Sequence, residues 1–264
     1  MGTNRWLAVW TYGVLVFLLG PFAIILYASF SDSPMIGIPL QDPGFRAYAD
    51  IFVGHRYVFS LWLSLRVAVV ATLAALLLGT AASLVLVRKR HYRLIRLLSA
   101  LMLAPLTIPL VIIGIALLIM FNRMAVPLHF WTLAAVHVVI LLPYVIRTVS
   151  ASLEHFNPSI EEAALNLGAG PWRTLFEITI PNLRPALITG GMLAFITSFG
   201  ETVVTVFILP PGKQTLPVDI FNTLVYNFSP SIAAISALVS VLVFAVVWLM
   251  SVIFPNLFAT GNSS

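Results

Sequence analysis

Cysteine is absent from this chain of 264 residues. The sequence therefore excludes structural disulfides, thiolate nucleophiles and cysteine-ligated zinc or iron–sulfur sites. Catalytic patterns are also missing, because the five histidines are scattered without metal-ligand spacing and neither H-E-x-x-H nor G-x-S-x-G occurs. We therefore expect no metal and no cofactor, and no catalytic set of residues stands out.

Charge is scarce as well. Charged residues make up 9% of the chain and hydrophobic residues 60%, whereas a soluble domain carries about 25% and about 45–50%. One folded core cannot hide that much apolar surface, so lipid must cover part of it. Apolar runs are spread evenly, which favours a single membrane domain over 1–264.

Six stretches have the roughly 20 mostly apolar residues of a transmembrane helix. They are 7–30, 58–87, 97–121, 131–153, 186–209 and 232–254. Arg5 before the first stretch also fits a signal peptide, but the apolar run is too long and no small-x-small cleavage site follows. We predict an all-α, polytopic bundle of about six transmembrane helices, the first of them uncleaved.

Basic residues gather in alternate loops. The second and fourth loops hold Arg88, Lys89, Arg90, Arg93, Arg96, Arg147, Arg173 and Arg184, and the other loops hold only Arg46, Arg56, Arg123 and Lys213. The positive-inside rule then places both termini on the cytoplasmic side of the membrane. It also explains the net charge of +5 better than nucleic-acid binding does. The outer loops, 31–57 and 210–231, are rich in proline and glycine and are expected to carry short interfacial helices.

The second stretch carries small residues every four positions. They are Ala71, Ala75, Gly79 and Ser83. Such a stripe lets another helix approach closely, and we interpret it as packing within the bundle rather than as a contact with another subunit.

The fourth loop, 154–185, is the longest polar stretch. Pro158 and the Ser159-x-x-Glu162 pattern predict a helix start with a capping box, and Gly168 with Gly170 predicts its left-handed end. Pro171 then opens a second short helix along Trp172, Leu175 and Phe176, Pro181 closes it, and Pro185 begins the next span. Two capped helices around a glycine elbow predict a compact cytoplasmic knob.

This loop resembles the EAA loop of permease subunits of binding-protein-dependent bacterial ABC importers. The matching residues are Glu162-Ala163-Ala164-x3-Gly168-x9-Ile178-x-Ile180-Pro181, with Ile180 where the family usually has Leu. Leu63-Ser64-Leu65 and Gly79-Thr80-Ala81-Ala82 are similar to the family's second span. Ser198-Phe199-Gly200-Glu201 and Thr215-Leu216-Pro217 are similar to the spermidine/putrescine-type branch, which more often has an acidic residue where Gly200 stands.

The resemblance implies a type I importer permease fold and a set of partners. These are a separate ATP-binding subunit in two copies, a sister permease in preference to a second copy of this chain, and an extracytoplasmic solute-binding protein. It also implies that the loop inserts a coupling helix into the ATP-binding subunit. The implied coupling residues are Glu161, Glu162, Ala163, Ala164, Leu167, Gly168 and Ala169.

The chain lacks an ATP site of its own. Gly212-Lys213 is the only Gly-Lys pair; Phe207 stands where a phosphate loop needs Gly, and Gln214 stands where it needs Ser or Thr. The motor is therefore expected on a separate polypeptide.

Two ionisable residues, Arg66 and Glu201, fall well inside predicted spans, where an unpaired charge is costly. With His137 they are expected to share a layer in the outer leaflet. Three hypotheses stay open: Arg66 and Glu201 pair, Glu201 lines a pathway for a cationic solute, or each side chain reaches the interface separately. Phe199 lies near this layer and is suited either to stacking on a cation or to packing.

A transporter subunit without enzyme activity is the leading interpretation. A self-contained secondary transporter is less favoured because no internal repeat is visible, and an intramembrane enzyme would need more than Arg66 and Glu201. The resemblance implies a small amine-bearing solute.

Overall fold

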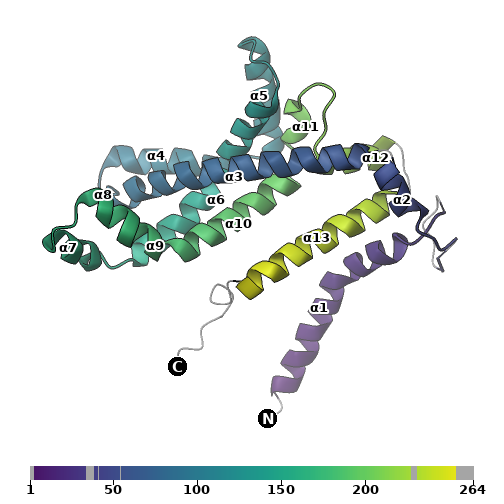
Figure 1. Ribbon diagram of the computed structural model, residues 1–264, viewed down its shortest axis with the longest axis horizontal. Coiled ribbons are helices and arrows are strands. Elements are labelled where there is room, and N and C mark those ends of the chain that lie inside the picture. The colour runs from purple at the N-terminus through teal and green to yellow at the C-terminus, as the bar shows by residue number, and fades with distance from the viewer. Residues whose placement is uncertain (1–2, 34–38, 41, 54, 227–230, 254–264) are drawn as a thin grey trace. The chain divides into compact units, whose positions relative to one another are not determined.

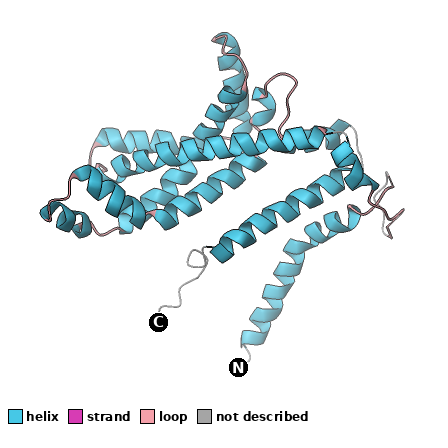
Figure 2. Cartoon of the chain, in the orientation of Figure 1, coloured by secondary structure: helices cyan, strands magenta, loops and turns pink. Residues whose placement is uncertain are grey.

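The computed structural model describes residues 3–33, 39–40, 42–53, 55–226 and 231–253. Within these residues the regular elements are helices, apart from one isolated bridge between Ser31 and Pro43 (Figure 2). The all-α prediction is therefore confirmed. The chain divides into two compact units, one made of 1–61 with 219–264 and the other of 62–218. That 1–264 forms one permease domain stays a prediction.

The first unit contains the helices of both chain ends, and α3 and α12 each cross its border. Its helices are α1 (Thr3–Ala28), α2 (Arg46–Val53), the start of α3 (Arg56–Arg88), the end of α12 (Leu216–Tyr226) and α13 (Ser231–Ile253). Helix α13 packs on α1 and α2, and Phe22 meets Phe244 edge-on with ring centroids 5.3 Å apart. Buried Asp219 pairs with Arg56 and accepts a hydrogen bond from Ser60 over 2.7 Å.

The second unit contains most of the longest helix, α3, and the polar loop (Figure 1). Its further elements are α4 (Arg93–Leu103), the 3-10 turn η1 (Ala104–Leu106), α5 (Leu110–Arg123), α6 (Phe130–His155), α7 (Ser159–Asn166), α8 (Pro171–Thr174), the π turn η2 (Leu175–Thr179), α9 (Ile180–Asn182), α10 (Arg184–Gly200) and α11 (Thr205–Ile208). Helix α6 is the central one, because it packs along α10 and has most of its inward side chains buried.

The small-residue stripe of α3 is the contact with α6. Ala71 and Ala75 are fully buried, and the Ser83 hydroxyl bonds the Gly79 and Ile146 carbonyl oxygens. A Cβ at Gly79 would lie 2.8 Å from a methyl carbon of Val145, so only glycine permits this approach. The packing interpretation of the stripe is confirmed.

The apolar stretches coincide with helices, but not all are single spans. Among the described residues, three helices are long and apolar enough to cross a membrane, and counting each of two bent pairs as one span raises the number to five. The stretch 97–121 is broken by a bend of 103° between η1 and α5. The prediction of one continuous span there was therefore wrong. Pro109 lacks the N–H that would continue the helix and stands as the N-cap of α5. The sixth stretch coincides with α13, Ser231–Ile253, which is apolar over most of its length.

Short helices also occur where the outer loops predicted them, namely α2 and α12. Their place at a membrane interface stays a prediction. Within the second unit, the backbone N–H of Leu216 donates to the Ser64 hydroxyl over 2.8 Å. Two of the segments that carried the family resemblance, one from the second span and one from the last outer loop, are therefore in contact.

Candidate functional site

The loop after α6 folds into a compact knob at one end of the second unit (Figure 1). Helix α7 ends in a Schellman arrangement, because the Gly168 N–H bonds the Leu165 carbonyl and the Ala169 N–H bonds the Ala164 carbonyl, each over 3.0 Å. Gly168 has φ +88°, which L-residues rarely adopt. The glycine elbow is therefore confirmed at Gly168, whereas Gly170 is extended and serves as the N-cap of α8.

The predicted capping box at the start of α7 was wrong. Pro158 already has helical angles, so Ser159 is the first residue inside the helix rather than its cap. Asn157 takes the capping role, since its side-chain oxygen accepts the Ser159 N–H over 3.0 Å. The proline shifts the helix start because its ring fixes φ near the helical value.

Pro181 does not close the second helix as predicted. The helical path runs on through α8, η2 and α9 to Asn182. The turn at η2 is a π turn in which the Ile180 N–H bonds the Leu175 carbonyl. This wider turn precedes the proline, whose ring would otherwise clash with the carbonyl four residues back. Pro171 and Pro185 stand at the starts of α8 and α10, as predicted.

Glu161 fastens the knob to the bundle. Its carboxylate accepts a hydrogen bond from Arg88 at the end of α3 over 2.5 Å and another from the Thr179 hydroxyl. Thr179 is fully buried, while the Glu161 side chain is 20% exposed. One carboxylate therefore joins α3, α7 and the second half of the knob.

The predicted coupling residues divide into two groups. Glu162, Ala163, Leu167 and Gly168 are exposed, whereas Glu161, Ala164 and Ala169 are partly or fully covered by the chain itself. Within α7 the division follows the helical period, which turns Glu161 and Ala164, three positions apart, toward the bundle. The pattern of the motif alone did not separate them.

The knob also exposes an apolar surface. Leu167 is 90% exposed and Trp172 is 73% exposed. Trp172 and Phe176 lie nearly parallel, with ring centroids 6.2 Å apart. Sequence reasoning placed these aromatic residues on the second helix but did not single them out as surface. The signal was their spacing of four, which puts both rings on one helix face.

Beside these rings Arg173 pairs with Glu177 over 2.8 Å. Both side chains are largely exposed, so the pair adds little to stability. The hydrogen bond that Arg173 donates to the Glu177 carboxylate raises the pKa of Arg173 above its ordinary value. The knob thus presents an exposed ion pair next to an apolar surface.

A second polar cluster is buried where α10 ends. His137 on α6 lies 2.8 Å from the Ser198 hydroxyl and 3.0 Å from the Thr205 hydroxyl through its two ring nitrogens. The Thr205 hydroxyl donates to Glu201, so its oxygen is left to accept from Nε2 of His137. A neutral ring then accepts the Ser198 proton at Nδ1. All four residues are buried.

Glu201 occupies a helix break. Helix α10 ends at Gly200 and Glu201 is extended, so the continuous span over 186–209 and the depth inferred for Glu201 along it were wrong. Its two carboxylate oxygens accept the backbone N–H groups of Val204 and Thr205 over 2.7 and 2.8 Å. The charge thereby satisfies donors that the interrupted helix leaves free.

Arg66 is not part of this cluster. Its guanidinium lies over the Phe130 ring, 5.0 Å from the centroid, and the side chain is exposed. No ion pair joins Arg66 to Glu201 in the described part of the second unit, so the pairing hypothesis is not supported by the geometry. Phe199 is buried and stacks on Phe195 with centroids 6.0 Å apart, which fits packing.

The sequence analysis also missed Asp219. It is fully buried in the first unit and bonded to Arg56 and Ser60. The signal available was a lone acid within an apolar segment of α12, and it was passed over because that segment was assigned to an outer loop.

Comparisons with known proteins agree with one another. The family model of the binding-protein-dependent transport system inner membrane component matches residues 71–258. The putrescine transport system permease protein PotI of Escherichia coli (strain K12) is 34% identical over 230 residues, which cover 84% of this chain and 81% of that protein. The spermidine/putrescine permease protein PotC of the same strain is 29% identical over 87% of this chain and 86% of that protein.

A third relative is the putative 2-aminoethylphosphonate transport system permease protein PhnV of Salmonella paratyphi A. It is 33% identical over 79% of this chain and 78% of that protein. Among solved structures, a bacterial ABC transporter that imports alginate gives a TM-score of 0.65 at 17% identity, covering 94% of this chain and 97% of that chain. At this identity the structural likeness shows the fold alone.

Proposed function

The chain belongs to the family of binding-protein-dependent transport system inner membrane components, and from this premise we propose how it couples to its motor and what it carries. It is a multi-pass permease subunit of an ABC importer in the inner membrane, and its partners are an ATP-binding subunit and a solute-binding protein. The comparisons support neither a self-contained secondary transporter nor an intramembrane enzyme.

We propose that the exposed side of the knob docks on the ATP-binding subunit. Glu162, Ala163, Leu167 and Gly168 form the inserted surface, and the rings of Trp172 and Phe176 border it. The observation that carries the proposal is the exposure of Leu167 and Trp172 on a rigidly capped loop. Aromatic and aliphatic side chains that become fully desolvated are the usual anchors of protein interfaces.

Glu161 serves a different purpose in this proposal. Its bonds to Arg88 and Thr179 hold the knob on α3, so a displacement of the docked surface also displaces α3. The covered residues Ala164 and Ala169 support the fold of the knob rather than touch the partner.

The docking proposal is tested with Leu167→Asp in the purified importer. A carboxylate at this position would be buried unpaired in the interface, so the ATP-binding subunit should no longer copurify and transport should be lost. Ser159→Asp is the matched control, because it adds the same charge to the first turn of the same helix, where the helix dipole favours it. Glu162→Lys should weaken association as well. Full association of Leu167→Asp would contradict the proposal.

We propose that the transported solute is a small molecule bearing a primary amine. The support is the printed substrates of the relatives, putrescine, spermidine with putrescine, and 2-aminoethylphosphonate, which share an aliphatic amine. The test is calorimetric binding of these three solutes to the cognate solute-binding protein, followed by uptake into vesicles. Tight binding of a solute without an amine would overturn the assignment.

We propose that the cluster of His137, Ser198, Thr205 and Glu201 borders the translocation pathway. Its support is the helix break that Glu201 caps, because interrupted helices with polar groups at membrane depth mark solute sites in transporters. Arg66 and Phe199 are retained as weaker candidates, Arg66 for its exposure and Phe199 for its place beside Ser198. Uptake by Glu201→Gln and His137→Gln, measured as KM and maximal rate separately, tests this placement.

We propose further that both termini are cytoplasmic and that the chain pairs with a sister permease above two ATP-binding subunits. The absence of cysteine allows a direct test, since single cysteines at Arg5 and Lys213 should react with a membrane-impermeant maleimide from opposite sides. Copurification of a tagged with an untagged copy of this chain would instead indicate a homodimer.

A further inference from the structure

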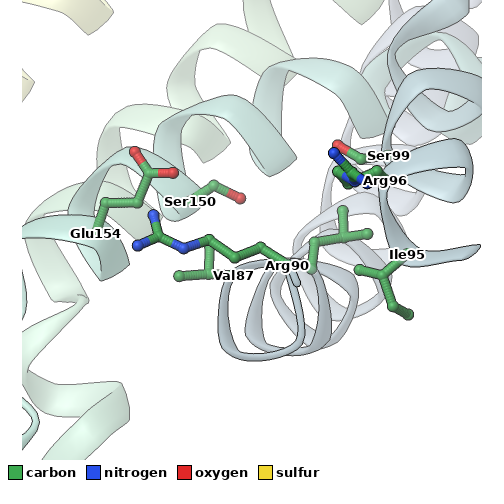
Figure 3. A pocket seen from close by; sticks show the side chains of 8 residues that line it. Val87, Arg90, Ile95, Arg96, Ser99, Ser150 and Glu154 are labelled. Atoms are coloured by element: carbon green, nitrogen blue, oxygen red, sulfur yellow. The ribbon is translucent and has the colours of Figure 1, made fainter. Parts of the chain in front are cut away.

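A small cavity opens beside the basic loop between α3 and α4. It has a volume of about 150 Å³. Figure 3 shows the Arg90 side chain pointing toward Glu154 near Ser150, with Arg96 and Ser99 close together on the other side of the view. The cavity therefore combines two guanidinium groups and two hydroxyl groups with a single carboxylate, and its walls carry a net charge of +1.

An apolar groove continues from this cavity. It has a volume of about 320 Å³ and shares Leu86 and Ile95 with the cavity. Ala81 and Ala82 line it on α3 and Met102 lines it on α4. From Leu86 back to Ala81 the helix rises about 7.5 Å, away from the charged end of the span. The groove thus runs from a polar boundary toward the depth of the hydrocarbon.

The charge around the cavity exceeds what the protein itself neutralises. Arg88 is occupied by Glu161, but no ion pair in the described residues engages Lys89, Arg90, Arg93 or Arg96. The first turn of α4 contains no acidic residue. An anion is therefore the ligand that the cavity favours, and the basic residues lie at the end of α3 that the charge bias assigns to the cytoplasm.

We propose that this cavity and groove bind one anionic phospholipid of the cytoplasmic leaflet. Its phosphate lies between Arg90 and Arg96 and accepts from the hydroxyls of Ser99 and Ser150, and one acyl chain follows the groove. Basic pockets between transmembrane helices on this side of a membrane are suited to anionic headgroups. A free phosphate or a nucleotide would leave the apolar groove empty, and only a lipid satisfies both parts at once.

Glu154 distinguishes the lipid proposal from a purely structural ion pair, because the two predict opposite effects of its removal on lipid affinity. It lines the same cavity, so it repels a bound phosphate and competes with it for Arg90. Glu154→Gln should bind the lipid more tightly, whereas Arg90→Gln and Arg96→Gln should bind it more weakly. If Glu154 merely orders Arg90, its removal would weaken binding as the arginine variants do, and the proposal would be wrong.

The test uses the purified importer complex and native mass spectrometry with palmitoyl-oleoyl-phosphatidylglycerol or the matching phosphatidylcholine. Each arginine variant should lose about fivefold in phosphatidylglycerol affinity, which corresponds to about 1 kcal/mol for a basic residue near an anionic surface. Arg184→Gln removes an exposed arginine outside this cavity and should change nothing. Equal retention of the two lipids by the unchanged complex would overturn the proposal.

A second experiment distinguishes a bound lipid from other ligands of the cavity. Ala81→Trp fills the groove without changing any charge, so it should reduce phosphatidylglycerol retention while inorganic phosphate fails to compete. Unchanged retention with competition by inorganic phosphate would assign the site to a free anion instead and refute the lipid. Loss of the ATP-binding subunit from the Arg90→Gln, Arg96→Gln double variant would make the surface a protein interface, which also refutes it.

Discussion

Replacement of Gly168 distinguishes two roles of this residue, namely the left-handed bend of the knob and the close approach of the ATP-binding subunit. Gly168 has φ +88°, and no atom of the chain outside its immediate neighbours lies within 4 Å of the position that a Cβ would take. Gly168→Ala therefore meets no clash and is strained only by its left-handed backbone, at a cost of about 1–2 kcal/mol. Asn tolerates this conformation better than Ala, so Gly168→Asn should cost less.

The strain is measurable at the neighbouring amides. The N–H groups of Gly168 and Ala169 are bonded to the carbonyls that end α7, and they exchange with solvent only when the bend opens. A cost of about 1–2 kcal/mol raises the open population roughly 5- to 30-fold. Hydrogen exchange followed by mass spectrometry should show that increase over 164–170 for Gly168→Ala and a smaller one for Gly168→Asn. Unchanged exchange in Gly168→Ala would refute the backbone reasoning.

Docking of the ATP-binding subunit does not predict that Gly168→Asn has a smaller effect than Gly168→Ala. Because the space around Gly168 is open within this chain, a partner that packs there would be blocked by any Cβ. Both variants should then lose the ATP-binding subunit to a similar extent, whatever their exchange rates. If Gly168→Asn keeps both association and transport while Gly168→Ala loses them, the residue serves the bend alone.

Three further variants follow from the second unit. Arg88→Gln should lower the free energy of unfolding by at most about 1 kcal/mol, because the pair with Glu161 is partly exposed. It should nevertheless lower transport, and exchanging the charges of Arg88 and Glu161 should restore it. A charge exchange that does not restore transport would contradict the fastening role of Glu161. Glu201→Gln should lower stability by about 1.5–3 kcal/mol, since the two backbone N–H groups bond different carboxylate oxygens and the amide NH2 that replaces one of them cannot accept. An unchanged melting temperature in detergent would count against the cap. Gly79→Ala should cost about 1–3 kcal/mol through the contact with Val145, and Val145→Ala in the same chain should recover much of it.

The sequence was sufficient for features that depend on composition and local chemistry. The apolar stretches predicted helices, the stripe around Gly79 predicted a close helix contact, and Gly168 predicted a left-handed elbow. Each of these follows from a property that the residue carries by itself, such as a missing side chain or a missing charge. They therefore hold in any tertiary setting in which the helices form.

Predictions failed where two local signals competed. Ser159 and Glu162 had the spacing of a capping box, but Pro158 fixes the preceding backbone angle and moves the helix start to Ser159 itself. Pro181 is a helix breaker by rule, yet the π turn before it makes room for its ring. No pattern in the sequence ranks such signals against each other, because the outcome depends on tertiary packing around the turn, where Thr174 and Thr179 are buried.

The charges inside the spans show a different limit. The sequence left three roles open for Glu201, namely pairing with Arg66, lining a pathway or reaching the interface. In the structure its carboxylate is satisfied by backbone N–H groups that a helix break sets free. A cationic solute that paired with Glu201 would have to draw the carboxylate away from Val204 and Thr205. Those donors would then be left without an acceptor, and the hydrogen bond that links Thr205 to His137 would loosen as well. Direct binding of an amine at Glu201 is therefore inseparable from a rearrangement of the break between α10 and α11. A solute that passes without touching Glu201 would leave this cluster intact, and exchange at the Val204 and Thr205 amides during turnover distinguishes the two routes.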